Sequence, residues 1–219
     1  SMHKILKLVF ILFLTLTTQL GPILGNPILK AQSKDTIIVA GGCFWCVEAD
    51  FEKVNGVSEV ISGYTGGFIE NPTYKQVVKG GTGHYEAVII HFDPKIISTK
   101  NILDKFFRSI DPTDNGGQFC DRGHSYKSAI FAKPNQVLTA KNALLEAEAI
   151  LGEKIVTPIL EAGTFFTAED YHQDYYKGEN LVFTRFGPIK QKNAYKRYRS
   201  ACRRNERLKE VWGKDAFLN

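Results

Sequence analysis

DTIIVAGGCFWCVEADFEKV, residues 35–54, is the stretch that decides the expected fold. Residues 35–40 form a short run that is β-branched and apolar after its first two positions, which is typical of a strand buried on both faces. Gly41 and Gly42 break this strand. Apolar residues then follow at helical spacing, namely Phe44, Val47, Phe51 and Val54. The sequence therefore predicts a buried strand that turns into a helix at Cys43.

The rest of the chain supplies further strands and helices. Runs of β-branched and apolar residues predict strands over 57–64, 86–92, 128–132 and 155–160. Pro158 lacks a backbone donor, so the last of these strands is expected at an edge of the sheet. Amphipathic periodicity predicts helices over 100–110, with Ser98 as N-cap, and over 135–151. This order indicates an α+β fold, an α/β sandwich in which a mixed β-sheet is flanked by helices.

A glycine-rich connection over residues 65–85 joins two of the predicted strands. It is expected to be a loop without secondary structure of its own. Loops of that length in compact domains usually carry function. The sequence therefore directs attention to the side chains in and around this segment.

Residues 1–25 are typical of a secretory signal peptide. Lys4 and Lys7 precede an apolar run over residues 8–16, and small or turn-forming residues follow. The alternative is an uncleaved membrane anchor, since the apolar stretch is barely long enough to span a bilayer. Residues 26–34 are expected to link this segment to the folded domain. The protein is therefore expected to be periplasmic or secreted, and to contact a membrane only if the signal is uncleaved.

The net charge of +5 is concentrated near the C-terminus. Nine lysines and arginines lie between Lys190 and Lys209, opposed by Glu206 alone. Residues 190–219 are therefore expected to form a basic tail of helical character beside a catalytic domain over residues 35–189. A nucleic-acid-binding tail is the alternative, but a solvated helical face is far commoner. Export also argues against DNA, so no nucleic acid partner is expected.

Cys43 is the candidate nucleophile. A cysteine at the first turn of a helix meets free N–H donors and the positive end of the helix dipole, which lower the thiol pKa. Cys46 lies one helical turn further on, so the two sulfurs could form a disulfide. Structural zinc usually needs two close ligand pairs, and these cysteines are the one such pair, so no metal is expected. Cys120 is expected to be a buried, packed thiol.

Six motifs resemble the peptide methionine sulfoxide reductase A family. They follow the family's order from about Thr36 to Tyr176, namely GGCFWCVEADFEKVNGV, SGYTGG, NPTYKQV, GTGHYEAV, FCDRGHSYKSAIF and EDYHQDYY. The resemblance implies a ferredoxin-like core with a long coiled C-terminal segment. It also implies a peptide-methionine (S)-S-oxide reductase, which reduces the S epimer of methionine sulfoxide, free or in proteins. Such an enzyme needs no cofactor beyond an external dithiol reductant such as thioredoxin, and we expect a monomer.

The resemblance assigns the central chemical roles to two residues. Cys43 matches the thiol that attacks the sulfoxide sulfur and becomes a sulfenic acid. Glu86 matches the carboxyl group that protonates the sulfoxide oxygen. An acid is required beside the thiol because this oxygen is a poor leaving group until it is protonated. Burial would raise the pKa of Glu86 toward neutrality and keep a proton available.

The resemblance also assigns residues that would bind the substrate. Tyr74 and Tyr126 match the hydroxyl groups that hold the sulfoxide oxygen. Asp121 matches an acid that supports this polar cluster through hydrogen bonds. Phe44 and Trp45 match the walls of a hydrophobic pocket for the substrate methyl group.

A sulfenic acid on Cys43 needs a resolving thiol, and two candidates compete. Cys46 is close in sequence, whereas Cys202 lies in YRSACRRNERLKEVWG, which is similar to a family segment that carries a recycling cysteine. That family segment usually reads Cys-Gly-Arg-Asp, and Arg203 in place of glycine puts the flexibility of the loop in doubt. We predict that Cys46 resolves Cys43 directly and that Cys202 is a second relay to the reductant.

Thiol-disulfide oxidoreductase activity is the main alternative function. It predicts that Cys43 and Cys46 suffice to reduce insulin disulfides. Domains with that activity lack the motifs of Glu86 and Tyr126, which argues against it. Structural or pocket-lining roles are expected for the histidines of the motifs, namely His84, His124 and His172.

Overall fold

A computed structural model describes residues 34–218 of the chain. The predicted signal peptide, residues 1–25, lies outside the described residues, as does nearly all of the predicted linker over 26–34. Within residues 34–218, no helix combines the length and the apolar character needed to cross a membrane.

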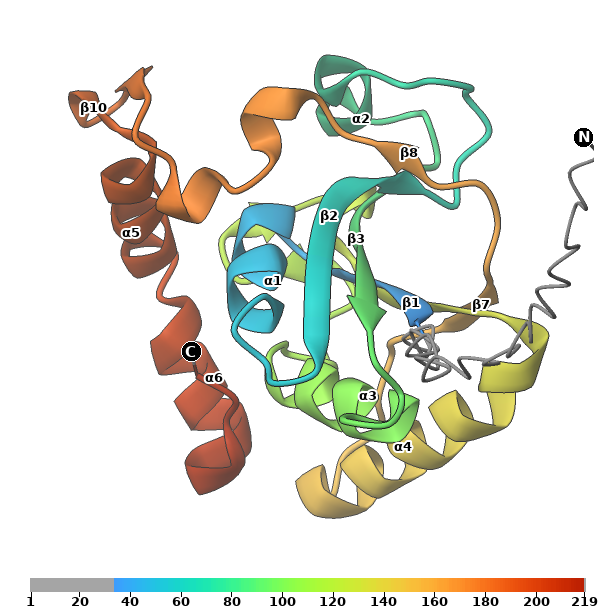
Figure 1. The fold of residues 1–219 in the computed structure, drawn as a ribbon. Helices are drawn as coiled ribbons and strands as arrows, with labels where there is room; N and C mark the ends of the chain where they lie inside the picture. Colours follow the sequence, from blue (N-terminus) through green and yellow to red (C-terminus); the bar gives the residue numbers. More distant parts are fainter. Residues whose placement is uncertain (1–33, 219) are drawn as a thin grey trace, which may run out of the picture. The chain divides into compact units, whose positions relative to one another are not determined.

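A six-stranded mixed sheet forms the centre of the fold (Figure 1). Its strand order is β7-β6-β1-β3-β2-β8; β6 and β7 run parallel, and the other neighbours are antiparallel. The strands are β1 (Asp35–Gly41), β2 (Val57–Thr65), β3 (Tyr85–Phe92), β6 (Ser128–Ala132), β7 (Ile159–Glu161) and β8 (Phe166–Thr167). β1 pairs with β3 and β6, and its residues from Ile37 onward are buried on both faces, as its apolar sequence predicts.

The α+β class, the mixed sheet and the edge position of β7 agree with the sequence-based prediction. β7 is shorter than predicted because Pro158 has no N–H to give to the sheet, and the strand starts only at Ile159. β1 and β2 are connected through α1 and lie on either side of β3. The ferredoxin-like core implied by the family resemblance stays a prediction.

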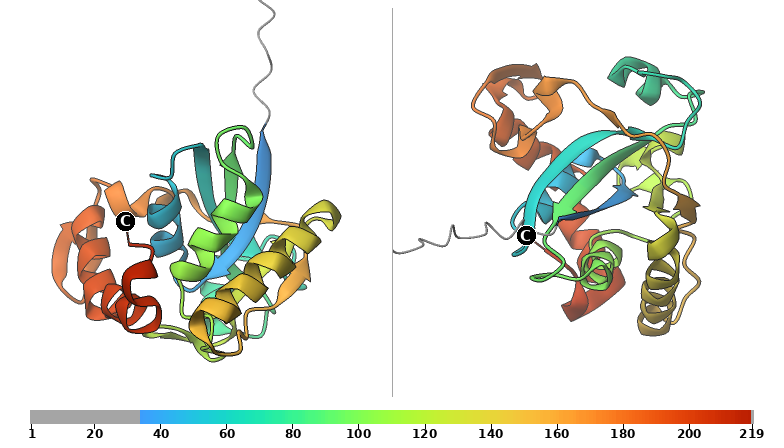
Figure 2. Two further views of the ribbon diagram at one scale, coloured as in Figure 1. Left: turned by 90° about the horizontal axis from the view of Figure 1, so that it is seen from below. Right: turned by 45° about the vertical axis from the view of Figure 1, so that its right-hand side comes forward.

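Helices cover one face of this sheet (Figure 2). The main cluster of buried side chains lies between the sheet and α1 (Phe44–Phe51), α3 (Thr99–Arg108) and α4 (Val137–Leu151). As predicted, Ser98 caps α3 through its side chain. Gly152 ends α4 in the left-handed conformation. The other face of the sheet carries a smaller apolar cluster against which Phe165 packs.

The glycine-rich connection is not structureless, contrary to the prediction. It contains α2 (Tyr74–Lys79), which starts with a capping box. The Thr73 hydroxyl accepts the backbone N–H of Gln76, and the Gln76 side chain accepts the backbone N–H of Thr73 at 2.8 Å. A helix of six residues is too short to show an amphipathic period, and these local bonds define its start.

The C-terminal segment is helical rather than coiled. Its elements are β9 (Leu181–Thr184), β10 (Gly187–Lys190), α5 (Gln191–Ala201) and α6 (Arg204–Trp212). The predicted helical character is confirmed, and the long coiled segment implied by the resemblance is wrong. Leu208 and Trp212 are buried in the main core, so apolar burial fixes this segment on the sheet domain.

Two arginines of the predicted basic tail are buried rather than solvated. Arg199 Nη1 lies 2.9 Å from Oδ1 of Asp50, a buried residue of α1. Arg204 is 2% exposed and donates to the carbonyl oxygens of Gly41 at 3.1 Å and Ser109 at 2.8 Å. Burying a cation is costly unless it has such partners. The tail therefore packs as part of the same core.

Candidate active site

Cys43 lies at the turn between β1 and α1, where it is the N-cap of the helix. Its carbonyl oxygen accepts the backbone N–H of Cys46 at 3.0 Å. Gly42 has φ +83°, and a Cβ atom added to it would lie 2.6 Å from Cβ of Gln118. The turn therefore requires glycine, and the segment of Gln118 packs directly against it. The predicted strand-to-helix turn at Cys43 is confirmed.

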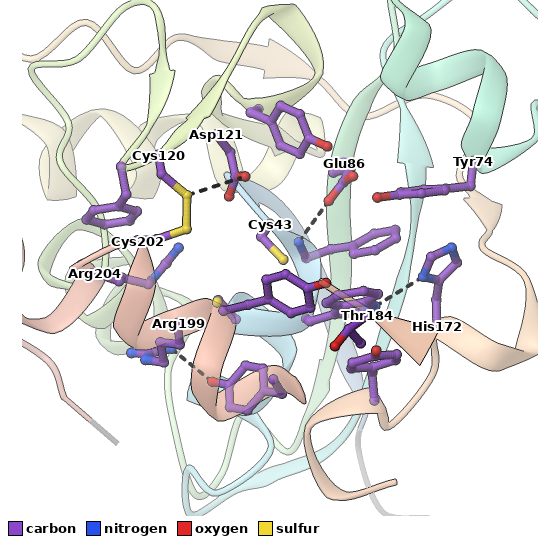
Figure 3. Close-up of a pocket in the computed structure, with 18 of the residues that line it drawn as sticks. Cys43, Tyr74, Glu86, Cys120, Asp121, His172, Thr184, Arg199, Cys202 and Arg204 are labelled. Atoms are coloured by element: carbon purple, nitrogen blue, oxygen red, sulfur yellow. Dashed lines mark hydrogen bonds between the residues drawn. A yellow bond between two sulfur atoms is a disulfide. The ribbon is translucent and has the colours of Figure 1, made fainter. Parts of the chain in front are cut away.

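One pocket of about 700 Å³ contains every residue that the sequence singled out for catalysis, substrate binding or recycling (Figure 3). These nine residues are Cys43, Phe44, Trp45, Cys46, Tyr74, Glu86, Asp121, Tyr126 and Cys202. They come from the start of α1, from α2 and β3, from the segment around Asp121 and from the end of α5. Segments far apart in sequence thus meet around one thiol, while the role of each residue stays a prediction.

An aromatic wall lines the pocket beside the nucleophile. The ring of Trp45 stacks on that of Tyr175, with centroids 3.7 Å apart and planes 4° apart. Its Nε1 donates to Nδ1 of His172 at 3.1 Å. The buried ring of Phe44 lies 5.0 Å from the His172 ring. Phe44 and Trp45 both line the pocket although they are adjacent, because the helix is only beginning at this point.

His172 lines the pocket as a neutral ring, in agreement with the expected pocket-lining role. Burial lowers its pKa to about 4. Because Nδ1 accepts from Trp45, the ring proton is on Nε2, which lies 3.9 Å from Oε2 of Glu169. Glu169 also accepts the backbone N–H of Tyr74 and the hydroxyl of Tyr64, each at 2.8 Å. This network fixes the first residue of α2 at the edge of the pocket.

Glu86 faces the pocket from β3 and is 1% exposed. Its Oε2 accepts the backbone N–H of Phe44 at 3.1 Å. Burial raises the pKa of its carboxyl group to about 8, and the nearby charge of Asp121 acts in the same direction. At neutral pH most of this carboxyl group is therefore protonated, which is the form that can donate to a substrate oxygen. The predicted effect of burial on this pKa is confirmed.

Tyr74 and Tyr126 bring two hydroxyl groups to the same pocket. Burial raises the pKa of both phenols, and the neighbouring Glu86 raises it further. Both side chains therefore stay protonated and can donate hydrogen bonds to an oxygen atom. Asp121 also points toward the space around Cys43 (Figure 3), and burial raises its pKa.

Cys43 and Cys46 are free thiols that share a hydrogen bond. This hydrogen bond raises the pKa of Cys43, as do burial and the charge of Glu86. The same bond lowers the pKa of Cys46 to about 7, and the positive charges of Arg204 and Arg199 contribute. The expectation that the helix start lowers the pKa of Cys43 is therefore wrong for the free enzyme. Cys46 is therefore the more acidic of the two thiols.

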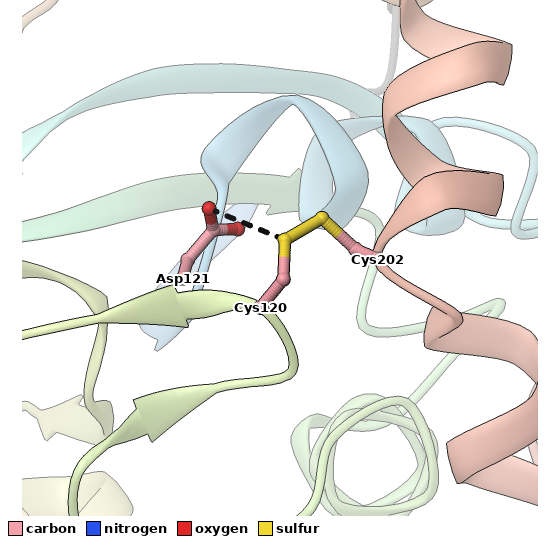
Figure 4. A group of neighbouring side chains, drawn as sticks. All are labelled: Cys120, Asp121 and Cys202. Carbon is pink, nitrogen blue, oxygen red and sulfur yellow. Dashed lines mark hydrogen bonds between the residues drawn. A yellow bond between two sulfur atoms is a disulfide. The ribbon is translucent and has the colours of Figure 1, made fainter.

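Cys120 and Cys202 are joined by a disulfide at the rim of the pocket (Figures 3 and 4). Their Cα atoms lie 4.9 Å apart although 82 positions separate them in sequence. Cys120 is exposed, so the expectation of a buried, packed thiol is wrong. The signal that could have indicated this pairing is an even number of cysteines in a chain expected to be exported, where disulfides persist.

Two groups of side chains in the described part of the chain have the spacing of metal ligands. Cys120, Asp121 and Cys202 form the first, but both of its sulfurs are held in the disulfide. Glu48, Glu52 and Asp174 form the second, and Lys177 Nζ lies 2.8 Å from carboxylate oxygens of both Glu52 and Asp174. Neither group offers the set of free thiolates and imidazoles that zinc prefers.

The β9–β10 hairpin forms part of the pocket rim, which the sequence did not indicate. Val182, Phe183 and Thr184 line the pocket, and the Phe183 side chain is 87% exposed. Arg185 places its guanidinium 5.3 Å from the ring of Tyr198, which also lines the pocket. A strand of four residues carries too little alternation to reveal such a role from sequence.

The geometry of the pocket defines a class of enzyme. A thiol at a helix start lies between an aromatic wall and a buried, largely protonated carboxyl group. A second thiol and a disulfide lie in the same pocket, so the site can accept oxidising equivalents on sulfur and pass them on. These features are those of a thiol-dependent oxidoreductase.

Comparisons with known proteins give the family. The sequence profile of the family described as peptide methionine sulfoxide reductase matches residues 35–216. Peptide methionine sulfoxide reductase MsrA 2 of Caulobacter vibrioides is 45% identical over 188 residues, which cover 85% of this chain and 90% of the relative. MsrA of Bacillus licheniformis is 42% identical over 187 residues, which cover 84% and 97%. The chain belongs to the peptide methionine sulfoxide reductase family, in its A type.

Solved structures agree with this assignment. Methionine sulfoxide reductase A of Corynebacterium diphtheriae is similar with a TM-score of 0.62 at 32% identity, over 70% of this chain and 76% of that chain. Mxr1 of Saccharomyces cerevisiae in its reduced form is similar with a TM-score of 0.62 at 31% identity, over 66% and 84%. The fold described above is therefore shared with enzymes of this family.

Proposed function

We propose that this enzyme reduces the S epimer of methionine sulfoxide, free and in proteins, to methionine. The observation that carries the proposal is the position of Cys43 between the aromatic wall of Phe44 and Trp45 and the carboxyl group of Glu86. The methyl group on sulfur suits the aromatic side, and the sulfoxide oxygen suits the side that donates protons. A site that holds these two substituents on different sides recognises one configuration at sulfur.

The first step is attack of Cys43 Sγ on the sulfoxide sulfur while Glu86 protonates the oxygen. The oxygen is transferred to Cys43 as a sulfenic acid, so methionine leaves and the cysteine is oxidised by two electrons. The proton that Cys43 gives up restores Glu86 to its acid form. Tyr74 and Tyr126 donate hydrogen bonds to the oxygen as negative charge develops on it.

Cys46 resolves the sulfenic acid in the second step. Its sulfur attacks Cys43 Sγ, a disulfide forms between the two, and water leaves. Cys46 suits this role because its pKa of about 7 makes much of it thiolate near neutral pH. Cys202 is held in the disulfide with Cys120, so it cannot act on Cys43 until that bond is reduced. A thioredoxin-like dithiol supplies the electrons, and no metal or organic cofactor takes part.

Export and repair of exported proteins are part of the proposal. Residues 1–25 have the order of a signal peptide, which supports a periplasmic or secreted enzyme. N-terminal sequencing of the exported protein distinguishes a cleaved signal from a retained anchor. We expect a monomer, which analytical ultracentrifugation of the folded domain can test.

The deciding experiment follows each epimer of methionine sulfoxide, free and in a peptide, with dithiothreitol as reductant. We expect loss of the S epimer alone, and no loss in Cys43→Ser. Equal loss of both epimers, or turnover in Cys43→Ser, would contradict the proposal. Reduction of insulin disulfides at a comparable rate would instead favour the thiol-disulfide oxidoreductase alternative.

A further inference from the structure

Four cysteines line one pocket as two pairs: an inner pair of free thiols, Cys43 and Cys46, and an outer pair, Cys120 and Cys202, joined as a disulfide. We propose that Cys120 is the terminal cysteine of an internal relay, in which the inner disulfide formed by catalysis is passed to the outer pair and is reduced there by a protein dithiol. This inference rests on the proposed function and names the residue through which its site is recycled.

The segment that carries Cys120 is held against the turn of the nucleophile. Gln118 is fully buried and packs against Gly42, where an added Cβ would lie 2.6 Å from its own Cβ. The Gln118 amide accepts the backbone N–H of Asp111 at 2.8 Å and donates to the Asp111 carbonyl oxygen at 2.7 Å. The outer pair therefore has a fixed place beside Cys43 rather than a place on a free loop.

The segment of Cys202 is anchored at the same place through Arg204. The Arg204 guanidinium lies 4.5 Å from the ring of Phe119, the residue before Cys120. It also donates to the carbonyl oxygen of Gly41 at 3.1 Å, at the end of β1. One buried side chain thus contacts both segments of the outer pair and the strand that leads into the inner pair.

The relay consists of two thiol-disulfide exchanges. The Cys202 thiolate attacks Cys46 Sγ, so a Cys202–Cys46 bond forms, the Cys43–Cys46 bond breaks and Cys43 leaves and takes up a proton. The Cys120 thiolate then attacks Cys202 Sγ, and Cys46 leaves as a thiolate. The inner pair is reduced by two electrons as the outer pair is oxidised by two. Cys46 is a good leaving group in the second exchange because its pKa is lowered to about 7.

Access for a partner differs between the two pairs. Cys46 is 7% exposed and Cys43 is only partly exposed inside the pocket, whereas Cys120 is exposed at the rim. A protein dithiol must bring its own sulfur up to the disulfide that it attacks, so the outer disulfide is the more accessible of the two. The observed combination of free inner thiols and a closed outer disulfide is the state in which such a relay ends.

Disulfide mapping tests the order of events. Fully reduced enzyme receives one equivalent of methionine S-sulfoxide in a peptide, without reductant, and is quenched with an alkylating agent at intervals. We expect an inner disulfide that appears first and decays as the outer disulfide accumulates. The control is Cys43→Ser under the same conditions, in which the outer disulfide should not form. An outer disulfide in Cys43→Ser, or an inner disulfide that persists in the wild type, would overturn the relay.

Steady-state kinetics test the role of Cys120 itself. In Cys120→Ser, turnover with a thioredoxin should fall at least about tenfold, because the accessible disulfide cannot form. The first turnover without reductant should still yield about one equivalent of methionine per chain. Cys202→Ser and the double variant should lose thioredoxin-dependent turnover to the same extent, because both residues act in one pathway.

The outcomes separate failure of the relay from failure of the proposed function. Unchanged turnover of Cys120→Ser with thioredoxin, with methionine still formed, would overturn the relay alone. Absence of methionine from the first turnover of the wild-type enzyme would instead refute the proposed function.

Discussion

The inner and outer cysteine pairs differ in their separation along the sequence and in their position in the pocket. Cys43 lies between β1 and α1 and Cys46 in the first turn of α1, in one pocket with the buried Glu86. Cys120 and Cys202 are 82 positions apart and meet at the rim of the pocket. The attack on the sulfoxide benefits from a site that excludes water, whereas recycling requires contact with a second protein. In the proposed mechanism, the pair that is close in sequence therefore does the chemistry, and the pair with the exposed cysteine meets the partner.

Cys43→Ser is expected to have the largest effect, and it tests directly whether the inner pair differs in role from the outer pair. Without the nucleophile, kcat/KM for a peptide sulfoxide should fall at least about 10⁴-fold with dithiothreitol as reductant. Cys120→Ser is the matched control, since this small dithiol can reach the inner disulfide and should keep that variant close to the wild type. Equal losses in the two variants would show that the pairs do not differ in role.

Glu86→Gln is expected to have the next largest effect, because it removes the proposed proton donor beside the inner pair. The value of kcat/KM should fall by about 10² to 10⁴. In the wild type the rate should decline as pH rises through the pKa of about 8, where the acid form is lost. The variant should lack this decline. Glu59→Gln, at an exposed position of β2, is the control and should behave as the wild type.

Glu86→Gln should also change how the free energy of unfolding depends on pH. The pKa of Glu86 is about 8 in the folded protein against an ordinary value of 4.5, so the folded state retains a proton that the unfolded chain releases between these values. The free energy of unfolding therefore decreases as pH rises from about 4.5 to 8. Glu86→Gln should lose this part of the decrease and exceed the wild type in stability above pH 8, by urea denaturation. A variant less stable than the wild type at every pH would contradict the assignment.

Arg199→Met should affect the inner pair from the wall of the pocket, which Arg199 lines. It removes the buried ion pair with Asp50, which should cost about 3 kcal/mol in the free energy of unfolding. It should also raise the pKa of Cys46, measurable as the pH dependence of its alkylation. Lys196→Met, at an exposed position of the same helix, is the control and should change neither quantity.

Changes at Arg203 should have the smallest effect on the free energy of unfolding. They test whether the backbone conformation next to Cys202 matters for the outer pair. Arg203 follows Cys202 with φ +54°, so it adopts a conformation that glycine enters readily. Arg203→Gly should therefore change the free energy of unfolding by less than about 1 kcal/mol. Arg203→Val should lower it by about 1 to 2 kcal/mol, because β-branched residues disfavour this conformation. Equal effects of the two changes, measured by denaturation, would argue that backbone conformation does not matter here.

Strands whose residues form a clear local sequence pattern were predictable. The strands expected over 57–64, 86–92 and 128–132 differ from β2, β3 and β6 by at most one residue at each end. Their β-branched runs and flanking turn residues mark the boundaries directly. α2 escaped prediction because its start depends on two side-chain bonds at Thr73 rather than on a repeating pattern.

Features that depend on tertiary contacts were not predictable in the same way. The family motifs indicated which side chains share the pocket, but not that Cys120 pairs with Cys202, since that requires two distant loops to meet. The sequence predicts that Arg199 and Arg204 are solvated charges. In the structure, Arg199 pairs with Asp50, and Arg204 donates to backbone carbonyl groups. The order of thiol acidity likewise depends on the hydrogen bond between Cys43 and Cys46 and on the charges of Arg204 and Arg199, which only the folded structure brings together.

The length of chain enclosed by the outer disulfide affects the thermodynamic stability of the enzyme. Linking residues 82 positions apart restricts the unfolded chain and stabilises the folded one by about 4.5 kcal/mol in the loop-entropy description. Calorimetry should therefore find a higher melting temperature for the form with the outer disulfide than for the fully reduced form. In each catalytic cycle the enzyme would therefore alternate between a more stable form, with the outer disulfide, and a less stable form, in which that disulfide is reduced. In the oxidising compartment that the proposed export implies, the enzyme would therefore wait for electrons in its more stable form.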